Sequence, residues 1–494
     1  MPTSTMFKYP RQDIVAGIVV FLVALPLCLG IAVASGVPPV SGLVAGAIGG
    51  LVVPWISRSA LSVTGPAAGL TAIVIAEIAA LGSLELFLTA VLLSGVIQIA
   101  LGVLKTGRYA ALVPSSVIKG MLAAIGITII WKQLPAAFGA TGGLFDIAGQ
   151  FHVGATLLTA LSLVILYGWK KTPMGKIAFL SPALIVVVLT SVLGVVFAGN
   201  PTLGLSPLQM VDVPLGGVVA LYEALPRPDF AGLTMPGVWV AAFTVAVVGG
   251  IETLLSLQAV DRLDPLRRTS PPDRELLAQG AANAASGFFG GLPVTAVIVR
   301  SGANVAAGGR ERLSALLHGV LLVLAVVFAG PLLTKIPLAA LAAVLIQVGL
   351  NLCKPALFST QVKLGWTQFL PFALTIAAVL ALDLLKGVIV GIIVGVMFVL
   401  FQNSRGAVVQ ERAPGGQLVL RFRRDGTFLS KPSIVTMLDQ VPEGEKVIID
   451  GTGEYIDHDV KEVIASFIAD APRRNILVTV AGIDLSMASA GGGH

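Results

Sequence analysis

Two short stretches, Val63-Thr64-Gly65-Pro66-Ala67-Ala68-Gly69 and Gly290-Gly291-Leu292-Pro293-Val294-Thr295-Ala296, interrupt a chain of long apolar segments. Each places Gly and Pro at the start of a segment shorter than the ~20 apolar residues that span a bilayer. Each opens the third element of a group of seven, and Pro66 and Pro293 lie 227 positions apart. Because seven is odd, the second group enters the membrane from the opposite side. The pattern predicts an inverted repeat whose two half-helices meet; two proline-kinked full-length helices are the alternative.

The composition places the whole chain in a membrane. Of its 494 residues 56% are hydrophobic and only 12% are charged, whereas soluble domains carry about a quarter charged residues. This excludes a cytosolic enzyme, a secreted disulfide scaffold and a disordered chain. The two cysteines and four histidines have no metal-ligand spacing, and no nucleotide-binding or nucleophile motif is present. The sequence therefore predicts a protein that is not an enzyme, has no cofactor and binds no nucleic acid.

The apolar segments predict an all-α polytopic protein with 14 transmembrane segments, surrounded by membrane lipid. They lie near 13–35, 39–56, 65–81, 85–104, 115–133, 152–168, 180–199, 237–256, 274–290, 294–308, 314–333, 337–353, 366–383 and 385–403. The loops on the side of the N-terminus carry most of the Lys and Arg, which predicts that both termini are cytoplasmic. We expect the protein to lie in the cell's inner (plasma) membrane. We expect an N-terminal segment over 1–12 and a transmembrane domain over 13–405, with repeats of about 13–199 and 237–403.

The composition changes after residue 405. Residues 406–494 are polar, with apolar runs at 418–422, 446–449 and 476–480 that read as strands. Helical patterns at 433–440 and 459–468 lie between them. The sequence predicts a small cytoplasmic α/β domain here.

Arg300 and the two half-helices are candidates for an anion site. A cation within a membrane segment is costly and usually faces a cavity or a partner. Helix N-termini add free N–H groups and a partial positive charge. We expect amides near 65–68 and 294–296 and two threonine hydroxyls to join Arg300. The alternative is that Arg300 reaches the interface or pairs with a carboxylate. The predicted anion-binding residues are Thr64, Gly65, Pro66, Ala67, Ala68, Pro293, Val294, Thr295, Ala296 and Arg300.

Glu252 and Ser256 are candidates for binding a coupling cation. They lie one helical turn apart in the eighth segment and so share a face. A carboxylate there could bind H⁺ or Na⁺, and no other metal site is predicted. A static ion pair between Glu252 and Arg300 is the alternative.

Residues 13–405 resemble the SulP (sulfate permease) family of inorganic anion transporters. The matching stretches are 62–68, 290–293 with Arg300-Ser301 and Asn304, 306–310, and 250–254. The resemblance implies the seven-plus-seven inverted fold shared with uracil permeases, core and gate domains, a homodimer and elevator-type movement. Residues 448–452 and 455–459 resemble a STAS domain, the family's usual C-terminal partner. The sequence of residues 21–30 and 62–70 is similar to that of bacterial members joined to carbonic anhydrase. This similarity favours bicarbonate as the transported anion.

These observations predict a secondary active transporter of a small inorganic anion, bicarbonate or sulfate, coupled to Na⁺ or H⁺. A chloride or anion exchanger, or an anion channel, on the same fold is the first alternative. A nucleobase–proton symporter is the second alternative. It would need a pair of carboxylates to bind a neutral base, and Arg300 in the second half-helix argues against it.

Overall fold

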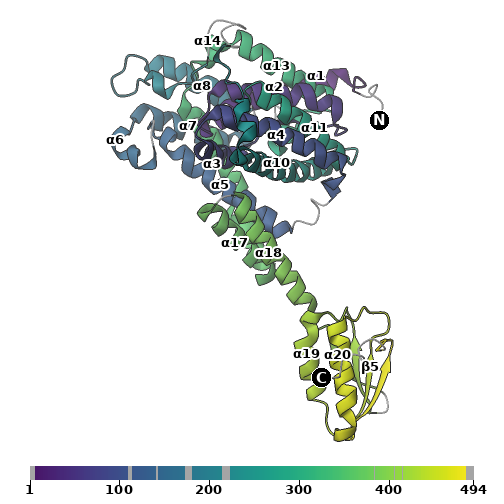
Figure 1. Cartoon of the computed structure of the whole chain (residues 1–494). Coiled ribbons are helices and arrows are strands. Elements are labelled where there is room, and N and C mark those ends of the chain that lie inside the picture. The colour runs from purple at the N-terminus through teal and green to yellow at the C-terminus, as the bar shows by residue number, and fades with distance from the viewer. Residues whose placement is uncertain are drawn as a thin grey trace. The chain divides into compact units, whose positions relative to one another are not determined.

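The computed structural model describes residues 6–108, 114–140, 143–172, 181–213, 223–382, 384–404, 406–413 and 416–485. The chain divides into two compact units, whose elements are labelled in Figure 1. The first comprises Met1–Gly365 with Phe372–Gly391, and the second comprises Trp366–Pro371 with Ile392–His494. The division falls inside two helices, α17 (Trp366–Ala381) and α18 (Leu384–Ser404).

The first unit is helical, and its long helices begin and end within a few residues of the apolar segments. Prolines stand in the first turn of five of them, where a missing N–H costs nothing. The first half contains α1 (Pro10–Ala34), α2 (Pro39–Ile56), α3 (Thr71–Leu81), α4 (Leu84–Val103), α5 (Ser115–Ala137), α6 (Ile147–Gln150), α7 (Val153–Gly168) and α8 (Pro182–Phe197). The second contains α10 (Pro236–Leu263), α11 (Pro272–Phe288), α12 (Ile298–Ala306), α13 (Leu313–Phe328), α14 (Gly330–Leu333), α15 (Leu338–Leu352) and α16 (Pro355–Lys363).

The surfaces of these helices suit a lipid environment. Within the described residues, six helical stretches are long and apolar enough to cross a membrane: Pro10–Ala34, Pro39–Ile56, Leu84–Val103, Ser115–Ala137, Pro236–Leu263 and Leu338–Lys363. Large apolar side chains point outward on shorter helices too, such as Phe328, which is 75% exposed, and Val196, which is 67% exposed. So much exposed apolar surface is not stable in water. The unit is therefore a polytopic membrane domain.

The short helices α6, α14 and α16 were not expected from the sequence. The first two have four residues each, and α16 has nine residues that mix polar and apolar types. Such segments are too short or too polar to stand out in a hydropathy pattern.

The helices of the first unit form two groups, which also show as neighbours in Figure 1. The first helix group consists of α1–α4 and α10–α13, and the second consists of α5, α7, α8 and α15. Within the second group, α5 and α15 touch at two glycines. A Cβ on Gly126 would lie 2.5 Å from the Gly349 carbonyl oxygen, and a Cβ on Gly349 would lie 2.7 Å from that of Gly126. Glycine thus permits the close backbone approach typical of membrane helices.

The most extensive contact in the first helix group joins α4 to α11. A Cβ on Gly95 would collide with the backbone of Gly280 and Ala284, and a Cβ on Gly287 would collide with the backbone of Leu92. Backbone atoms cannot move aside as a flexible side chain can. The two helices therefore depend on these glycines for their spacing.

Replacing Gly95 by Ala is expected to destabilise the first unit, because overpacking against backbone costs about 3 kcal/mol. Gly168→Ala is the matched control, since a Cβ there meets no atom within 4 Å. The measurement is the melting temperature of each purified variant in detergent, with its elution profile. A Gly95→Ala variant that melts together with the Gly168→Ala variant would contradict the packing described.

The second unit contains a four-stranded sheet in the order β3 (Val408–Arg412), β4 (Leu418–Phe422), β5 (Lys446–Asp450), β6 (Leu477–Ala481). The strands β4, β5 and β6 are parallel, and β3 joins β4 antiparallel. The helices α19 (Lys431–Asp439) and α20 (His458–Asp470) pack on it through a core that includes Leu420, Ile449 and Ile464. Three strands and both helices coincide with the predicted ones, whereas β3 was not expected. Residues 486–494 lie outside the described residues.

Candidate functional site

The two Gly/Pro stretches come together in the structure as a pair of short strands. The strand β1 (Thr64–Pro66) pairs antiparallel with β2 (Val294–Ala296), with Gly65 opposite Thr295. A 3-10 turn, η2 (Ala68–Leu70), and α3 follow β1, while α12 follows β2. Two short helices therefore start beside one crossing, here called the β1–β2 crossing. Extended backbone at this point, not a kinked full-length helix, interrupts each segment.

Side chains from α10 and α11 satisfy the backbone of the crossing, and a side chain of α4 supports them. Asn283 of α11 brackets Val294: its Oδ1 accepts from the Val294 N–H at 2.7 Å, and its Nδ2 donates to the Val294 carbonyl at 3.0 Å. The same Nδ2 donates to Gln98 Oε1 of α4 at 2.8 Å. Thr253 Oγ1 of α10 accepts from the Ala296 N–H at 3.3 Å. These amide and hydroxyl groups replace the water that extended backbone would otherwise need.

A second polar chain holds β1. Thr64 Oγ1 accepts from Gln279 Nε2 of α11 at 2.7 Å, and the same nitrogen donates to Glu275 Oε1 at 2.9 Å. The Ser57 hydroxyl donates to the other oxygen of Glu275. Sequence reasoning missed Gln98, Asn283, Gln279 and Glu275. Gln98, Gln279 and Asn283 could have been found as polar residues within apolar helical segments, where burial is costly unless they are paired. Glu275 follows Asp273 and Arg274 in the first turn of α11, so it does not stand out in this way.

A cavity of about 90 Å³ lies where the two short helices begin. Ala68 and Gly69 line it from η2, Val297–Val299 from the start of α12, and Glu252 and Ser256 from α10. Apolar side chains of α5 and α15, including Ile125 and Val348, close its other side. It therefore lies between the two helix groups. The first N–H groups of each short helix have no partner within that helix, so amides of both helices are available beside the cavity.

The Glu252 carboxylate projects against Gly69. A Cβ on Gly69 would lie 2.6 Å from Glu252 Oε1 and 2.8 Å from Oε2, so glycine leaves the room that this carboxylate occupies. Glu252 Oε2 is buried and has no hydrogen-bond partner within the described part of the chain. A buried carboxylate oxygen without a donor is costly. It is suited to hold a proton or to ligate a cation.

Arg300 packs against Gly65 of the β1–β2 crossing and does not line the cavity. Its side chain is fully buried, and the side of Gly65 that lacks a Cβ faces its Nη1. Its Nη2 donates weakly to the Pro66 carbonyl at 3.4 Å, while Nε and Nη1 have no partner among the described residues. Cys28 of α1 and His318 of α13 are its neighbours. Within the described residues no ion pair joins Arg300 to Glu252, so the static-pair alternative is wrong.

The position of Arg300 differs from the expectation that it joins the amides at the anion. The apolar segment was expected to start at 294, but the α12 helix starts at Ile298. Successive helical residues are turned by about 100°, so Ile298 and Val299 face the cavity while Arg300 points back to Gly65. Its charge can act on the cavity through space.

The other predicted anion-site residues divide in the same way. Ala68 lines the cavity, as do the two predicted cation-binding residues Glu252 and Ser256. By contrast, the β1–β2 crossing is formed by Thr64, Gly65, Pro66, Val294, Thr295 and Ala296, with Ala67 and Pro293 beside it. The amides of Val294 and Ala296 are already bonded to Asn283 and Thr253. The Thr64 hydroxyl is bonded to Gln279. The expected donors from 294–296 are thus used to build the crossing, and the available amides lie at Ala68, Gly69, Ile298 and Val299.

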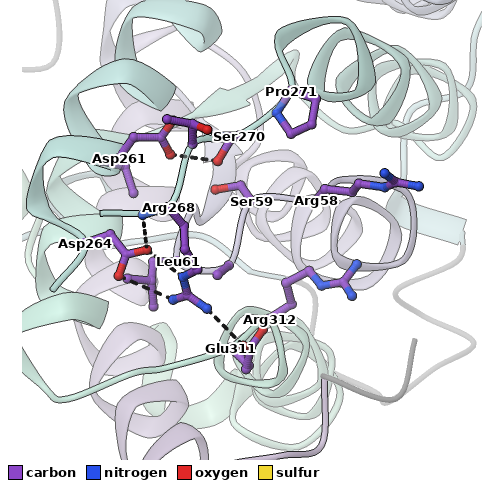
Figure 2. A pocket seen from close by; sticks show the side chains of 13 residues that line it. Arg58, Ser59, Leu61, Asp261, Asp264, Arg268, Ser270, Pro271, Glu311 and Arg312 are labelled. Atoms are coloured by element: carbon purple, nitrogen blue, oxygen red, sulfur yellow. Dashed lines mark hydrogen bonds and ion pairs between the residues drawn. The ribbon is translucent and has the colours of Figure 1, made fainter. Parts of the chain in front are cut away.

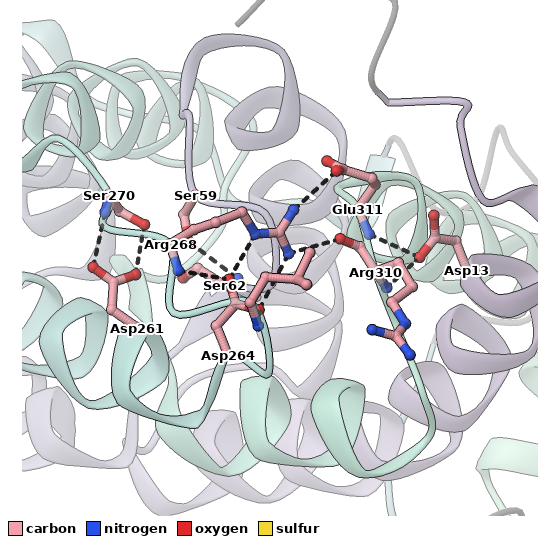
Figure 3. A network of polar contacts seen from close by, with 10 residues as sticks. Asp13, Ser59, Ser62, Asp261, Asp264, Arg268, Ser270, Arg310 and Glu311 are labelled. Carbon is pink, nitrogen blue, oxygen red and sulfur yellow. Dashed lines mark hydrogen bonds and ion pairs between the residues drawn. The ribbon is translucent and has the colours of Figure 1, made fainter.

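A polar network, here called the loop network, ties together the loops at one end of the first helix group. Arg268 donates to Asp264 at 2.6 Å and to Glu311 at 2.9 Å, beside a cavity of about 180 Å³ (Figure 2). The network extends to Asp13 of α1 (Figure 3). Its Oδ1 accepts from the amides of Arg310 at 2.7 Å and Glu311 at 2.9 Å. Burial alone would raise the pKa of Asp264, but hydrogen bonds from Arg268 and the Leu266 amide hold it below its usual range. The network fixes the loops that follow α10 and α12.

Replacing Arg268 by Gln is expected to cost about 3 kcal/mol, because two largely buried carboxylates lose their common partner. Arg267→Gln removes an equal charge from the adjacent exposed residue and is the matched control. Thermal melts of both purified variants would measure the difference. Equal melting temperatures would show that the loop network contributes nothing to stability.

Known transporters resemble this chain in sequence and in fold. The Sulfate permease family profile matches residues 11–375. YvdB of Bacillus subtilis, which bears the name of a sulfate transporter, is 28% identical over 505 residues, covering 96% of this chain and 91% of its own. The transmembrane domain of a cyanobacterium bicarbonate transporter, BicA, has a TM-score of 0.66 at 25% identity, covering 78% of this chain and 98% of that one. The murine Slc26a9 anion transporter has a TM-score of 0.78 at 18% identity, covering 98% of this chain and 87% of that one, which shows a shared fold.

Proposed function

The chain belongs to the sulfate permease family, and from that premise we propose that it is a secondary active transporter of a small inorganic oxyanion, bicarbonate or sulfate, coupled to Na⁺ or H⁺. One observation carries the proposal: the Glu252 carboxylate shares a cavity with the starts of two short helices. That cavity offers a partner to a cation and to an anion at once. The names of the relatives, a sulfate transporter and a bicarbonate transporter, support the class of anion.

The anion binds at the two helix starts. The amides of Ala68, Gly69, Ile298 and Val299 are placed to donate to its oxygen atoms, and both helix dipoles favour negative charge there. Arg300 adds a full positive charge from behind the crossing without a direct contact. Thr64 and Pro293–Ala296 serve the site by holding the two helix starts together.

The cation binds at Glu252, with the Ser256 hydroxyl one turn away as a further oxygen ligand. Coupling follows from charge. An ionised Glu252 repels an anion in the same small cavity, and a Na⁺ ion or a proton removes that repulsion. Each solute therefore favours binding of the other, which is the property that a symporter requires.

We propose that the chain crosses the inner membrane 14 times, with both termini cytoplasmic, and that residues 406–494 form a STAS domain. The first helix group carries the cavity and moves against the second in an elevator-type cycle, within a homodimer. The location of the cavity between the two groups supports this, because relative movement would open it to one side and then the other.

Uptake by proteoliposomes tests the proposal. Purified protein is reconstituted and exposed to labelled bicarbonate or sulfate, with an inward Na⁺ gradient, an inward proton gradient or neither. We expect accumulation of one anion above its external concentration under one of the gradients. Uptake that only equilibrates, or a large single-channel conductance in planar bilayers, would replace the symporter by an exchanger or a channel. Absence of all anion flux would overturn the function.

A further inference from the structure

Three cavities follow one another from the Glu252 site toward the end of α5. The Glu252 cavity shares Ala68 and Ile125 with a second cavity of about 10 Å³. The second shares Ala34, Lys132 and Gln133 with a third cavity of about 220 Å³. The second cavity has room for about one water molecule, so the route narrows there.

The narrow part lies between the two helix groups. Thr71 and Ala72 line it from the start of α3, and Thr128 and Ile129 line it from α5. The wide third cavity lies where α1 ends and α15 begins. If the termini are cytoplasmic, as proposed above, this is the outer end of the first unit. The three cavities then describe a closed outer half of a transport route.

Lys132 is the one cation among the residues that line these cavities. It lies near the end of α5, lines both the narrow and the wide cavity, and is exposed. Within the described residues its ammonium group makes no hydrogen bond or ion pair. Glu252 is the other charged lining residue, and it lines only the innermost cavity. The outer route is thus positive at its narrowest point.

We propose that Lys132 is the outer recruiting residue for the transported anion. It attracts a small inorganic anion into the wide cavity and holds it against the constriction until α3 separates from α5. This inference rests on the proposed function and adds to it a residue that recruits the anion. A lysine that merely extends from a helix end to the membrane interface would also look exposed, so the test must report on charge along the route.

The test compares Lys132→Gln with Lys132→Arg, and with Lys335→Gln as a matched control. Lys335 is an exposed lysine in the loop between α14 and α15, at the same end of the unit, and it lines none of the three cavities. Initial rates of uptake from the outer side are measured over a range of anion concentrations. For Lys132→Gln we expect KM to rise about fivefold with little change in maximal rate, and the rise to shrink at high ionic strength. Lys132→Arg and Lys335→Gln should keep the original KM.

Restoring the charge separates recruitment from a structural role. Lys132→Cys is made in a Cys353→Ser background, since Cys28 is fully buried. A trimethylammonium-bearing methanethiosulfonate reagent forms a disulfide with the thiolate and releases methanesulfinate, which restores a positive charge. We expect this reagent to return KM toward the original value and a sulfonate-bearing analogue to raise it further. An unchanged KM in Lys132→Gln, or equal effects of the two reagents, would overturn the inference while uptake continues; absence of uptake by the unaltered protein would overturn the proposed function with it.

Discussion

Glu252→Gln is expected to abolish the dependence of anion uptake on the cation gradient, with a loss of at least about 100-fold in gradient-driven rate. The amide keeps the size of the side chain but can no longer ligate Na⁺ as an anion or exchange a proton. Glu252 Oε2 has no hydrogen-bond donor in the described structure, and under the proposed function its charge is balanced by the coupling cation or by a proton. The measurement is the uptake of labelled anion into proteoliposomes, with and without each cation gradient.

The control for this variant is Glu85→Gln. Glu85 is an exposed carboxylate in the first turn of α4 and lies outside the cavity. It should transport as the unaltered protein does. Glu252→Asp should keep part of the dependence on the cation gradient. Its carboxylate is still charged, but the side chain is one methylene group shorter and reaches less far into the cavity. Coupling that survives in Glu252→Gln would remove Glu252 from the mechanism.

Arg300→Met is expected to raise the KM for the anion about 10- to 100-fold, as a loss of ~2 kcal/mol of attraction implies. The protein should melt at the same temperature or higher. The guanidinium is fully buried with two nitrogens unpartnered among the described residues, so it costs stability where it lies. Removing a costly buried charge stabilises the folded state, but it also removes the positive electrostatic field beside the cavity.

A lower affinity for the anion together with an equal or higher melting temperature distinguishes an electrostatic role of Arg300 from a packing role. Arg300→Lys keeps the charge and should keep most of the affinity. Arg262→Gln, at an exposed position in the last turn of α10, controls for loss of one positive charge from the unit. An Arg300→Met variant with an unchanged KM would show that its charge does not reach the anion.

The sequence predicted the meeting of the two short segments because Gly and Pro stand at matching places in two groups of seven segments, which indicates an inverted repeat. It also predicted that Glu252 and Ser256 share a face, since one helical turn separates them, and both line the cavity. Both predictions rest on positions along the chain. The first uses the match between the two groups of segments, and the second uses the length of one helical turn.

The direction of Arg300 could not be predicted in this way. It depends on the residue at which α12 starts, and Ile298 starts it because the preceding residues pair with β1. That pairing depends in turn on Asn283 and Thr253, which lie on other helices and have no spacing motif. A side chain supplied by a distant helix is decided by tertiary packing, which leaves no local pattern in the sequence.

The central claim is that the two helix starts and Glu252 form one site for an anion and its coupling cation. Cryo-electron microscopy maps of the protein in lipid nanodiscs, recorded with the coupling ion and with or without the transported anion, test it most directly. We predict new density in the cavity, within hydrogen-bonding reach of the amides of Ala68 and Ile298 and beside Glu252. Anion density elsewhere, with this cavity unchanged between the two maps, would contradict the claim.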